Sequence, residues 1–402
     1  MPGGKTRMPG GRAAIVGGGI GGLTLALALR SRGWRAEVFE QAPEFGEVGA
    51  AVALSANGTR VLRQLGVLER IAARSAVPSE LIYRRWNDGE RIAAFPAGDG
   101  YERRYGAPYF GVHRADLQQV LLAACGHDHV RTGSRLVDLE QTADRVRLTF
   151  SDGRVEEADV AVGADGVHSA TRRWITGADV AVYSGTSGFR GLVPMGSLPK
   201  LPDPGALQYW AGPGGHLLHY PIGGGVVNFL AVVAGPATWT GADWATEVER
   251  SEISGAFAGW HPAVLEMVSQ ASTARRWGLF GQSPLRRWTR GRVALLGDAA
   301  HAMLPHHGQG ANQTIEDAAA LAELLAGAGS SKPVADALGD YERLRKARTR
   351  QVQLASWVAS ERLHLPDGPE LARRDRDLAD VPRHVDWIHA HDAREAAEAR
   401  VS

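Results

Sequence analysis

The chain contains only one cysteine, Cys125, among 402 residues. One thiol cannot close an internal disulfide or build a cysteine metal site, and such usage is typical of a reducing cytoplasm. An excess of one charge is also lacking, because 45 basic residues stand against 44 acidic ones. The formal net charge of +1 gives no electrostatic reason to expect nucleic acid or an anionic membrane as partner. These absences favour a cytoplasmic protein that acts on a small molecule.

Long apolar runs are absent as well. No stretch of about 18 consecutive apolar residues occurs, so a transmembrane helix is not expected. The first residues, MPGGKTRMPGGR, are basic and glycine-rich and lack the apolar segment of a signal peptide. We therefore expect residues 1–11 to form a disordered tail. The length of the chain favours two domains plus an appendage.

The first part of the chain has the pattern of an α/β nucleotide-binding domain. An apolar strand at 12–16 precedes a glycine turn, an apolar helical run and a second strand at 35–40, which together predict a βαβ unit. Leucines at helical spacing predict a helix over 56–74. We assign residues 12–180 and 285–335 to this domain.

A second domain is predicted over residues 181–284, where glycine, proline and tryptophan become frequent. The strand candidates lie at 205–210, 216–221 and 226–234. A helical piece is expected near 244–257. The pattern indicates a mainly antiparallel sheet with one face available to a ligand. Residues 82–106 are expected to leave the first domain as an excursion toward this sheet, and residues 336–402 to form a charged, helical C-terminal segment.

The glycine turn GGGIGG, Gly17–Gly22, fits the pattern GxGxxG between a strand and a helix. Glycines there let the backbone approach a pyrophosphate, which then sits at the helix N-terminus. Glu40, at the end of the second strand, is placed to accept hydrogen bonds from ribose hydroxyls and disfavours a 2′-phosphate. The alternative for Glu40 is an ordinary solvated glutamate at a strand end.

Two later segments place an aspartate beside glycines after an apolar strand. The first, GADG at 163–166, contains Asp165 and is also compatible with a simple turn. The second, LGDAAHAMLPHHGQGAN at 296–312, puts Asp298 where it can bind the hydroxyls of a polyol. Its glycines precede a helix whose N-terminal dipole favours an anion such as a reduced flavin.

In this order, and together with HRADL at His113–Leu117, these motifs resemble the single-component FAD-dependent monooxygenases, the group A flavoprotein hydroxylases, of the salicylate hydroxylase-like branch. The resemblance spans about residues 12–330. It implies an α/β fold in which a Rossmann-like FAD-binding domain, of the glutathione-reductase type in its hydroxylase variant, carries the β substrate domain and a C-terminal helical segment.

The resemblance also assigns roles around a non-covalently bound FAD. The residues implied at the ADP half are Gly17, Gly19, Gly22, Glu40, Gln41, Arg114 and Leu136. Asp165 is implied near the pyrophosphate and the path of the nicotinamide, and Asp298 at the ribityl chain. The residues implied beside the flavin ring are Ala51, Val52, Pro305, His306, Gly308, Gly310, Ala311 and Asn312.

The activity implied is hydroxylation of a small aromatic or heteroaromatic substrate. NADH or NADPH reduces the flavin, O2 converts it to a C4a-hydroperoxyflavin, and one oxygen atom passes to the substrate. Only one nucleotide fingerprint is present, so the nicotinamide donor is expected to bind transiently. The partners implied are the aromatic substrate, O2 and NAD(P)H, with the protein as a monomer or homodimer.

Candidates for contact with the substrate come from the predicted strand 216–221, on which His216 and Tyr220 share a face. Either could deprotonate or orient a phenol, and a structural role is open for both. Pro305 and His306 are expected at the reactive edge of the flavin. The hydroxynicotinate-type branch has a histidine where this chain has Ala53, so that base is missing. A metal site is not expected, because no helix would align the histidines of the 296–312 segment.

Two other functions remain open on the same scaffold. A flavin oxidase or halogenase is one alternative, although the halogenase signature WxWxIP does not occur. A non-catalytic flavoprotein that serves as a redox-binding module is the other. It would bind FAD without any substrate-stimulated oxidation of NAD(P)H.

Overall fold

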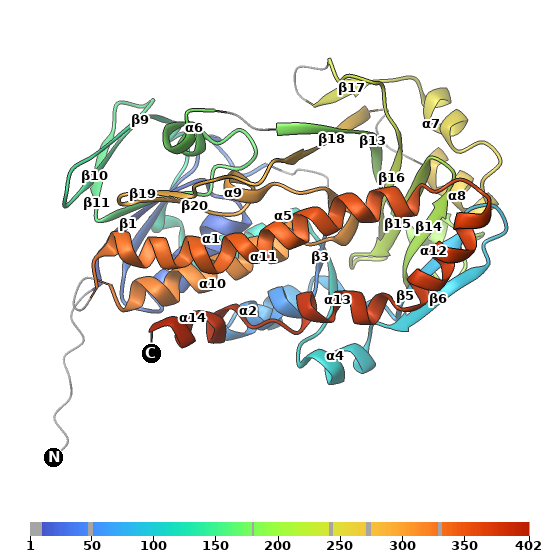
Figure 1. Cartoon of the computed structure of the whole chain (residues 1–402), viewed down its shortest axis with the longest axis horizontal. Helices are drawn as coiled ribbons and strands as arrows, with labels where there is room; N and C mark the ends of the chain where they lie inside the picture. The colour runs from blue at the N-terminus through green and yellow to red at the C-terminus, as the bar shows by residue number, and fades with distance from the viewer. Residues whose placement is uncertain are drawn as a thin grey trace.

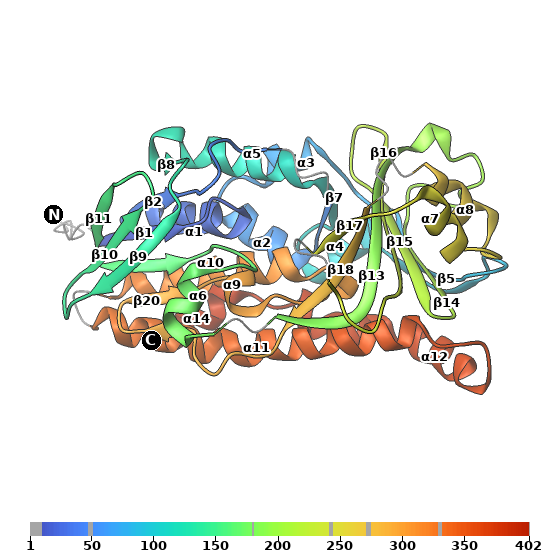
Figure 2. The same cartoon turned by 90° about the horizontal axis from the view of Figure 1, so that it is seen from above.

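The computed structural model describes residues 10–46, 51–178, 181–240, 244–270, 275–328 and 332–401. Most of the predicted tail, residues 1–9, lies outside these ranges. Within them, no helix is both long enough and apolar enough to cross a membrane. Two large sheets lie toward opposite ends of the molecule, and a long helix runs beside both (Figures 1 and 2).

A six-stranded sheet forms the first layer. Its order is β19 (Thr289–Arg290), β20 (Val293–Leu295), β12 (Val160–Gly163), β1 (Arg12–Val16), β2 (Arg35–Phe39) and β8 (Val130–Arg131). The strands from β20 to β8 are parallel, and Ile15 pairs with both Val38 and Val162. Because helices cover a parallel sheet, its strands are short apolar runs. The predicted βαβ unit is present, and Glu40 follows directly after β2.

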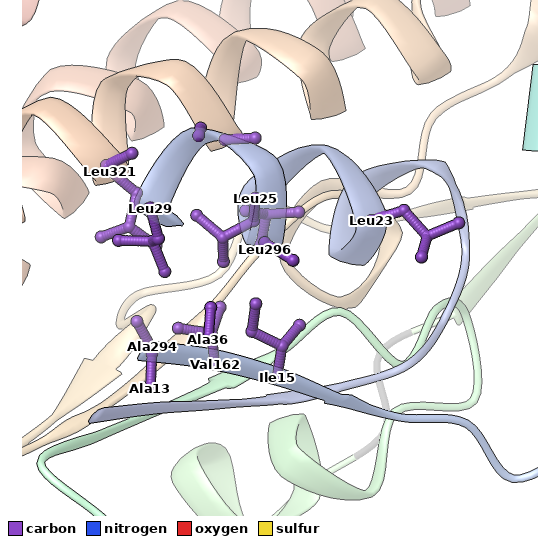
Figure 3. Close-up of a cluster of buried hydrophobic side chains, with 14 of the residues drawn as sticks. Ala13, Ile15, Leu23, Leu25, Leu29, Ala36, Val162, Ala294, Leu296 and Leu321 are labelled. Carbon is purple, nitrogen blue, oxygen red and sulfur yellow. The ribbon is translucent and has the colours of Figure 1, made fainter. Parts of the chain in front are cut away.

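Helix α1 (Ile20–Arg30) packs against one face of this sheet (Figure 3). Its Leu25 and Leu29 lie against Ala13 and Ile15 of β1, in one buried apolar cluster. Helix α10 (Gly310–Ala326) packs along the other side of α1 and contributes Leu321. Helix α1 therefore packs against both the sheet and α10. These contacts fix the position of the glycine turn that precedes it.

The predicted helix over 56–74 is wrong in one respect. The structure has two helices there, α2 (Ala56–Gln64) and α3 (Leu68–Ala72). Gly66 lies between them with φ +71°, a left-handed conformation that ends a helix and that glycine adopts without strain. The leucine spacing continued across this break and so concealed it.

An eight-stranded sheet forms the second layer. Its order is β17 (Ala245–Glu247), β18 (Arg275–Gln282), β13 (Ala181–Pro194), β16 (Val226–Ala234), β15 (Gly215–Pro221), β14 (Leu207–Gly212), β5 (Glu80–Arg85) and β6 (Arg91–Pro96). All neighbours are antiparallel except β14 and β5. The segment expected as a helix near 244–257 begins as strand β17 and becomes helix α7 (Arg250–Ala256) only afterwards.

The two faces of this sheet differ. Trp210 and Phe229 pack on one face against α7 and α8 (Pro262–Ser269) in a closed apolar cluster. Leu218 and Tyr220 point to the opposite face, where they border a cavity. Because side chains alternate along a strand, one sheet supplies both a core and a binding wall.

The C-terminal helices tie the two sheets together. Helix α11 (Val334–Leu363) extends across the molecule, and α12 (Pro369–Ala379), α13 (Val381–His389) and α14 (Ala393–Val401) return along it to α10 (Figure 1). A buried ionic cluster fastens α11 to α10. The Arg345 guanidinium contacts Glu316 at 2.5 Å and Asp317 at 2.7 Å, and both carboxylates are fully buried.

Candidate active site

A cavity of about 340 Å³ lies between the two sheets. Its walls come from the glycine turn, strand β3 (Ala51–Leu54), the open face of the eight-stranded sheet and residues 296–314. The predicted residues that line it are Gly19, Ala51, Val52, Arg114, Tyr220, Asp298, Pro305, Gly308, Gly310 and Ala311. The structure thus brings together residues that are almost 300 positions apart in the sequence.

The glycine turn is built for close approach of backbone to backbone and of backbone to ligand. Gly17 has φ +109°, and a Cβ on Gly22 would lie 1.9 Å from the carbonyl oxygen of Gly17. A Cβ on Gly19 would meet nothing within 4 Å, because this residue borders the cavity. The first and last glycines therefore shape the turn, and Gly19 leaves space at the start of α1 for a bound group such as a pyrophosphate.

Glu40 is tied to the same turn. Its carboxylate accepts hydrogen bonds from the backbone amides of Gly18 at 2.6 Å and Ala42 at 2.9 Å. The backbone amide of Ser134 donates a hydrogen bond to the Glu40 carbonyl. This contact brings the segment that precedes Leu136 close to Glu40. Leu136 itself lies in the apolar core, and Gln41 is exposed.

Asp298 faces the cavity from an otherwise buried turn. It is exposed, whereas Leu296, Gly297 and Ala299 around it are buried. It begins the short helix α9 (Asp298–His301), directly after β20. A carboxylate held at this edge suits the hydroxyls of a ribityl chain, as the sequence predicts.

The turn that presents Asp298 is anchored from behind. Asp317 of α10 accepts a hydrogen bond from the Gly297 amide at 3.0 Å and contacts the His301 imidazole at 2.5 Å. Its other oxygen binds Arg345. The arginine and the histidine beside it keep the pKa of Asp317 below its usual value, against the effect of burial. His301 is thus a structural residue and does not line the cavity.

Replacing Asp298 with alanine is expected to raise the dissociation constant for FAD about 10-fold, because a hydrogen bond to a charged group contributes about 1.5 kcal/mol. Titration of the apoprotein with FAD, followed by flavin fluorescence, measures the change. Asp152→Ala, in an exposed turn, is the matched control. Unchanged FAD retention in Asp298→Ala would reject the assigned role.

The start of α10 lies across the cavity from the sheet. Gly310 and Ala311 are the first residues of this 17-residue helix, and both border the cavity. Their amides have no partner inside the helix, because the first turn of any helix leaves its N–H groups free. Asn312 behaves differently: its side chain binds the carbonyls of Ala53 and Gly308 and the amide of Ser55, so it fixes the loop.

The carboxylate of Asp165 also forms hydrogen bonds within the protein. It accepts hydrogen bonds from the amide and hydroxyl of Thr171 at 2.9 and 3.0 Å and from the Ser169 hydroxyl. These contacts hold the start of α6 (Ala170–Thr176). Gly166 lines the cavity beside it, so the GADG segment reaches the cavity through its backbone.

Arg190 is a cavity residue that the sequence patterns did not single out. It lies on β13 opposite Leu230 and therefore on the same open face as Leu218. Burial and the nearby Arg114 lower the pKa of its guanidinium. Within the described ranges its guanidinium has no hydrogen-bond or ion-pair partner, and it lies 5.4 Å from the centre of the Trp277 ring. The signal available in the sequence was an arginine in the short segment FRGLV, next to apolar residues and a glycine.

The charges that line the cavity are unequal. Arg114 and Arg190 are cationic, and Asp298 is the one acidic residue among its described lining residues. Tyr209 and Tyr220 add hydroxyl groups in the same sheet, and burial raises the pKa of both well above the usual value. The lining therefore carries an excess of positive charge, which suits an anionic ligand.

His216 and His306 lie behind the cavity wall. Both are almost fully buried, and their rings are 5.0 Å apart. His216 shares the face of Leu218 and Tyr220, but its Nδ1 faces His364 at 2.7 Å. Of the four predicted catalytic residues, Tyr220 and Pro305 border the cavity. His216 and His306 do not border it and lie behind the residues that do.

Comparison with known proteins gives consistent matches. A family described as an FAD binding domain matches residues 12–356. The chain is 41% identical to 3-amino-4-hydroxybenzoate 2-monooxygenase of Streptomyces cremeus, over 95% of each chain. It is 34% identical to 6-hydroxynicotinate 3-monooxygenase of Bordetella bronchiseptica, over 86% of this chain and 90% of the relative. The crystal structure of Klebsiella pneumoniae HpxO with FAD and uric acid superimposes with a TM-score of 0.84 at 30% identity, covering 94% of this chain and 95% of that one.

Proposed function

Because this chain belongs to the family of FAD-dependent aromatic monooxygenases, we propose that it hydroxylates a small phenol that carries a carboxylate. The predictions of an FAD cofactor, of a monooxygenase and of an α/β fold with a C-terminal helical part are confirmed. The observation that carries the finer proposal is Arg190, a cavity cation with no ionic partner in the described chain. The substrate in the name of the Streptomyces relative, an aminohydroxybenzoate, belongs to the same chemical class.

The residues present fit FAD. Gly19 leaves room at the start of α1, Asp298 faces the cavity, and the start of α10 borders it. FAD, reduced by NADH or NADPH, supplies the activation of O2 for insertion into the aromatic ring. The chain supplies a fixed position and favourable electrostatics around that chemistry.

The open face of the β sheet would position the substrate. Arg190 would pair with the carboxylate, which is a charge-assisted and therefore strong hydrogen-bonded contact. Tyr220, whose raised pKa keeps its hydroxyl protonated at neutral pH, would donate a hydrogen bond to the phenolic oxygen. Leu218, Leu230 and Leu304 line the same space and would exclude water from the reacting atoms.

A comparison of hydroxybenzoates, aminohydroxybenzoates and their methyl esters tests this proposal. The FAD-loaded protein is expected to oxidise NADH or NADPH faster with the free acids, with matching O2 uptake, little peroxide and a product one oxygen atom heavier. The esters are the matched control, because they keep the ring and the hydroxyl but lack the charge. Equal stimulation by acids and esters would contradict the carboxylate proposal, and no stimulation by any phenol would contradict aromatic hydroxylation.

Two further expectations stay predictions. They are the cytoplasmic location and the monomeric or homodimeric state.

A further inference from the structure

A second cavity lies beside the active-site cavity, on the substrate side of the molecule. Its volume is about 180 Å³. A cavity of about 150 Å³ is large enough to bind benzene. Its walls come from helix α4 (Asp99–Tyr105), the strands β5 and β6, and helix α13, which lies next to α4 (Figure 1). We call this space the side chamber. No residue predicted to hold FAD is among its described lining residues.

The walls of the side chamber are mostly aromatic and apolar. Tyr101 is the central ring, and its centre lies 4.6 Å from that of Tyr105 and 5.4 Å from that of Tyr109. Phe95 of β6 lines the same space. Aromatic rings in such a group hold a planar aromatic molecule by offset stacking or by edge-to-face contact. The side chamber therefore suits a small aromatic ligand.

His389 of α13 adds a polar group to this lining. Its Nδ1 lies 3.0 Å from the Tyr101 hydroxyl, and that hydroxyl also accepts a hydrogen bond from the Ala56 amide. Because the amide donates to the hydroxyl oxygen, the hydroxyl proton is left for Nδ1. Burial lowers the pKa of His389 to about 3, so the ring is neutral at pH 7. A neutral imidazole that accepts at Nδ1 carries its proton on Nε2.

Nε2 of His389 is available to a ligand. The side chain is only 7% exposed. Even so, Nε2 has no partner among the described residues, and unlike Nε2 of His216 it is not shut off from accessible space. Since His389 lines the side chamber, this nitrogen can donate a hydrogen bond to a phenolic or carboxylate oxygen of an aromatic molecule inside it.

The side chamber and the active-site cavity share part of their walls. Tyr109 and Leu207 line both spaces, so their side chains stand between the two. Leu207 is the first residue of β14, and Tyr109 lies in the loop between α4 and β7 (Phe110–His113). The partition therefore includes a loop residue as well as a strand residue.

The ring of Tyr109 is held less firmly than the two tyrosines beside it. The hydroxyl of Tyr101 binds His389, and that of Tyr105 binds Asp386. The hydroxyl of Tyr109 has no hydrogen-bond partner in the part of the chain that the structure describes. No hydrogen bond therefore opposes a rotation of this ring.

The outer end of the side chamber reaches solvent between α4 and α13. Pro96 and Arg104 line it and are exposed, whereas Tyr101 and Tyr109 deeper in the chamber are buried. The Arg104 guanidinium contacts Asp386 of α13 at 2.6 Å and so ties the two helices together beside the opening. The side chamber thus has one end at the surface and the other at the wall of the active-site cavity.

We propose that the side chamber is the route by which the aromatic substrate enters the active-site cavity. This inference rests on the proposed function, which supplies a phenol that carries a carboxylate. The ring enters between α4 and α13 and packs among the tyrosines, while Nε2 of His389 donates a hydrogen bond to one of its oxygen atoms. It then passes Tyr109 and Leu207 when their side chains turn aside. The substrate can therefore arrive while FAD stays in its place, and α13 of the C-terminal segment forms the outer wall of the route.

Filling the side chamber tests this route. Val385 of α13 lines it and is half-buried, so Val385→Trp should obstruct it. In the FAD-loaded full chain, we expect the association and dissociation rate constants of a hydroxybenzoate to fall together by at least about 10-fold. The dissociation constant should not change, because the same obstacle is crossed in both directions. A stopped-flow record of the flavin absorbance, without NAD(P)H, measures both rates. His384→Trp, at the exposed neighbour on the same helix, is the matched control.

Two further variants keep the test decisive if Val385→Trp folds poorly. Val381→Trp fills the side chamber from the first turn of α13 and should slow both rates in the same way. His389→Phe keeps an aromatic ring and removes the Nε2 donor. It should lower the association rate constant about 5-fold, which corresponds to one hydrogen bond of about 1 kcal/mol. The FAD content and the unfolding midpoint show whether each variant is folded.

The outcomes separate the route from the proposed function. Wild-type association rates in folded Val385→Trp and Val381→Trp would overturn the route alone, because the substrate would then enter elsewhere. A raised dissociation constant with an unchanged association rate constant would also overturn it, since the substitutions would then only distort the active-site cavity. An unchanged rate in His389→Phe would overturn the contact assigned to Nε2. Failure of the wild-type protein to bind or oxidise any hydroxybenzoate would contradict the proposed function and the route with it.

Discussion

Replacing Arg190 with methionine is expected to lower kcat/KM for a hydroxybenzoate about 100-fold. Truncating one member of a buried charge pair costs about 2–5 kcal/mol, and about 3 kcal/mol corresponds to this factor. Methionine keeps the apolar stem that packs by Trp277 and removes only the charged head. Steady-state oxidation of NAD(P)H, read together with the hydroxylated product, gives the ratio. Lysine at this position keeps the charge but loses the planar fork, so it should recover part of the loss.

The chain offers a matched control for this change. Arg275 stacks on the same Trp277 ring at 5.5 Å, but it is exposed and does not border the cavity. Arg275→Met should leave kcat/KM unchanged. An equal loss with the methyl ester of the substrate would show that Arg190 does not recognise the carboxylate. A rise in the FAD dissociation constant alone would assign the guanidinium to the cofactor.

Replacing Arg345 with methionine is expected to lower the free energy of unfolding by about 3–5 kcal/mol. The change leaves Glu316 and Asp317 fully buried without their shared cation, and an uncompensated buried charge is costly. Arg348 still binds Glu316, and His301 still contacts Asp317, so the loss should stay within this range. Denaturant-induced unfolding of the FAD-loaded protein measures it. Arg343→Met, which removes an exposed arginine and leaves Asp340 paired with Lys332, should change stability by less than about 1 kcal/mol.

The ionic cluster also sets an acid dependence. Nearby cations lower the pKa of both Glu316 and Asp317 in the folded protein. A lowered folded-state pKa contributes stability that is present above the unfolded-state value and is lost as the pH falls through the folded-state value. The difference between wild type and Arg345→Met should therefore be constant near neutral pH and shrink below about pH 4, near the unfolded-state values. A difference that grew in acid would contradict the assigned role of these carboxylates.

Local sequence was sufficient for the nucleotide-binding half of the molecule. The turn at Gly17–Gly22 is visible as a pattern of six residues, although only part of its need for glycine is local: Gly22 leaves room for Gly17, whereas Gly17 leaves room for the distant Ala164. Asp298 could be found in the same way, because it directly follows a strand and precedes a glycine-rich loop. A local motif was enough to find both features, although the residues that hold them in place, such as Ala164 and Asp317, come from other parts of the chain.

Residues set by long-range register could not be found in this way. Arg190 borders the cavity because β13 pairs with β16 so that Arg190 lies opposite Leu230, and nothing within β13 specifies that pairing. His364 reaches His216 only because a 30-residue helix ends at the right distance. The predicted catalytic role of His306 likewise depended on nearness to the flavin loop, and the structure places its ring behind that loop. The predicted place of Asn312 beside the flavin ring stays a prediction, and the direction of its side chain depends on strand β3, which lies more than 250 residues away in the sequence.

The parallel pairing of β5 with β14 has a consequence for how such enzymes can diversify. The edge of the substrate-side sheet is made by residues that precede most of the flavin-side domain in the chain, and Leu207 pairs with Leu81 across that seam. Residues 181–284 therefore do not form a complete sheet that could be exchanged on its own. Recombination that transplanted them alone would pair a new β14 with the β5 of a different sheet. If Arg190 and Tyr220 contact the substrate as proposed, point substitutions on the open face should change the substrate range more readily than exchange of the domain.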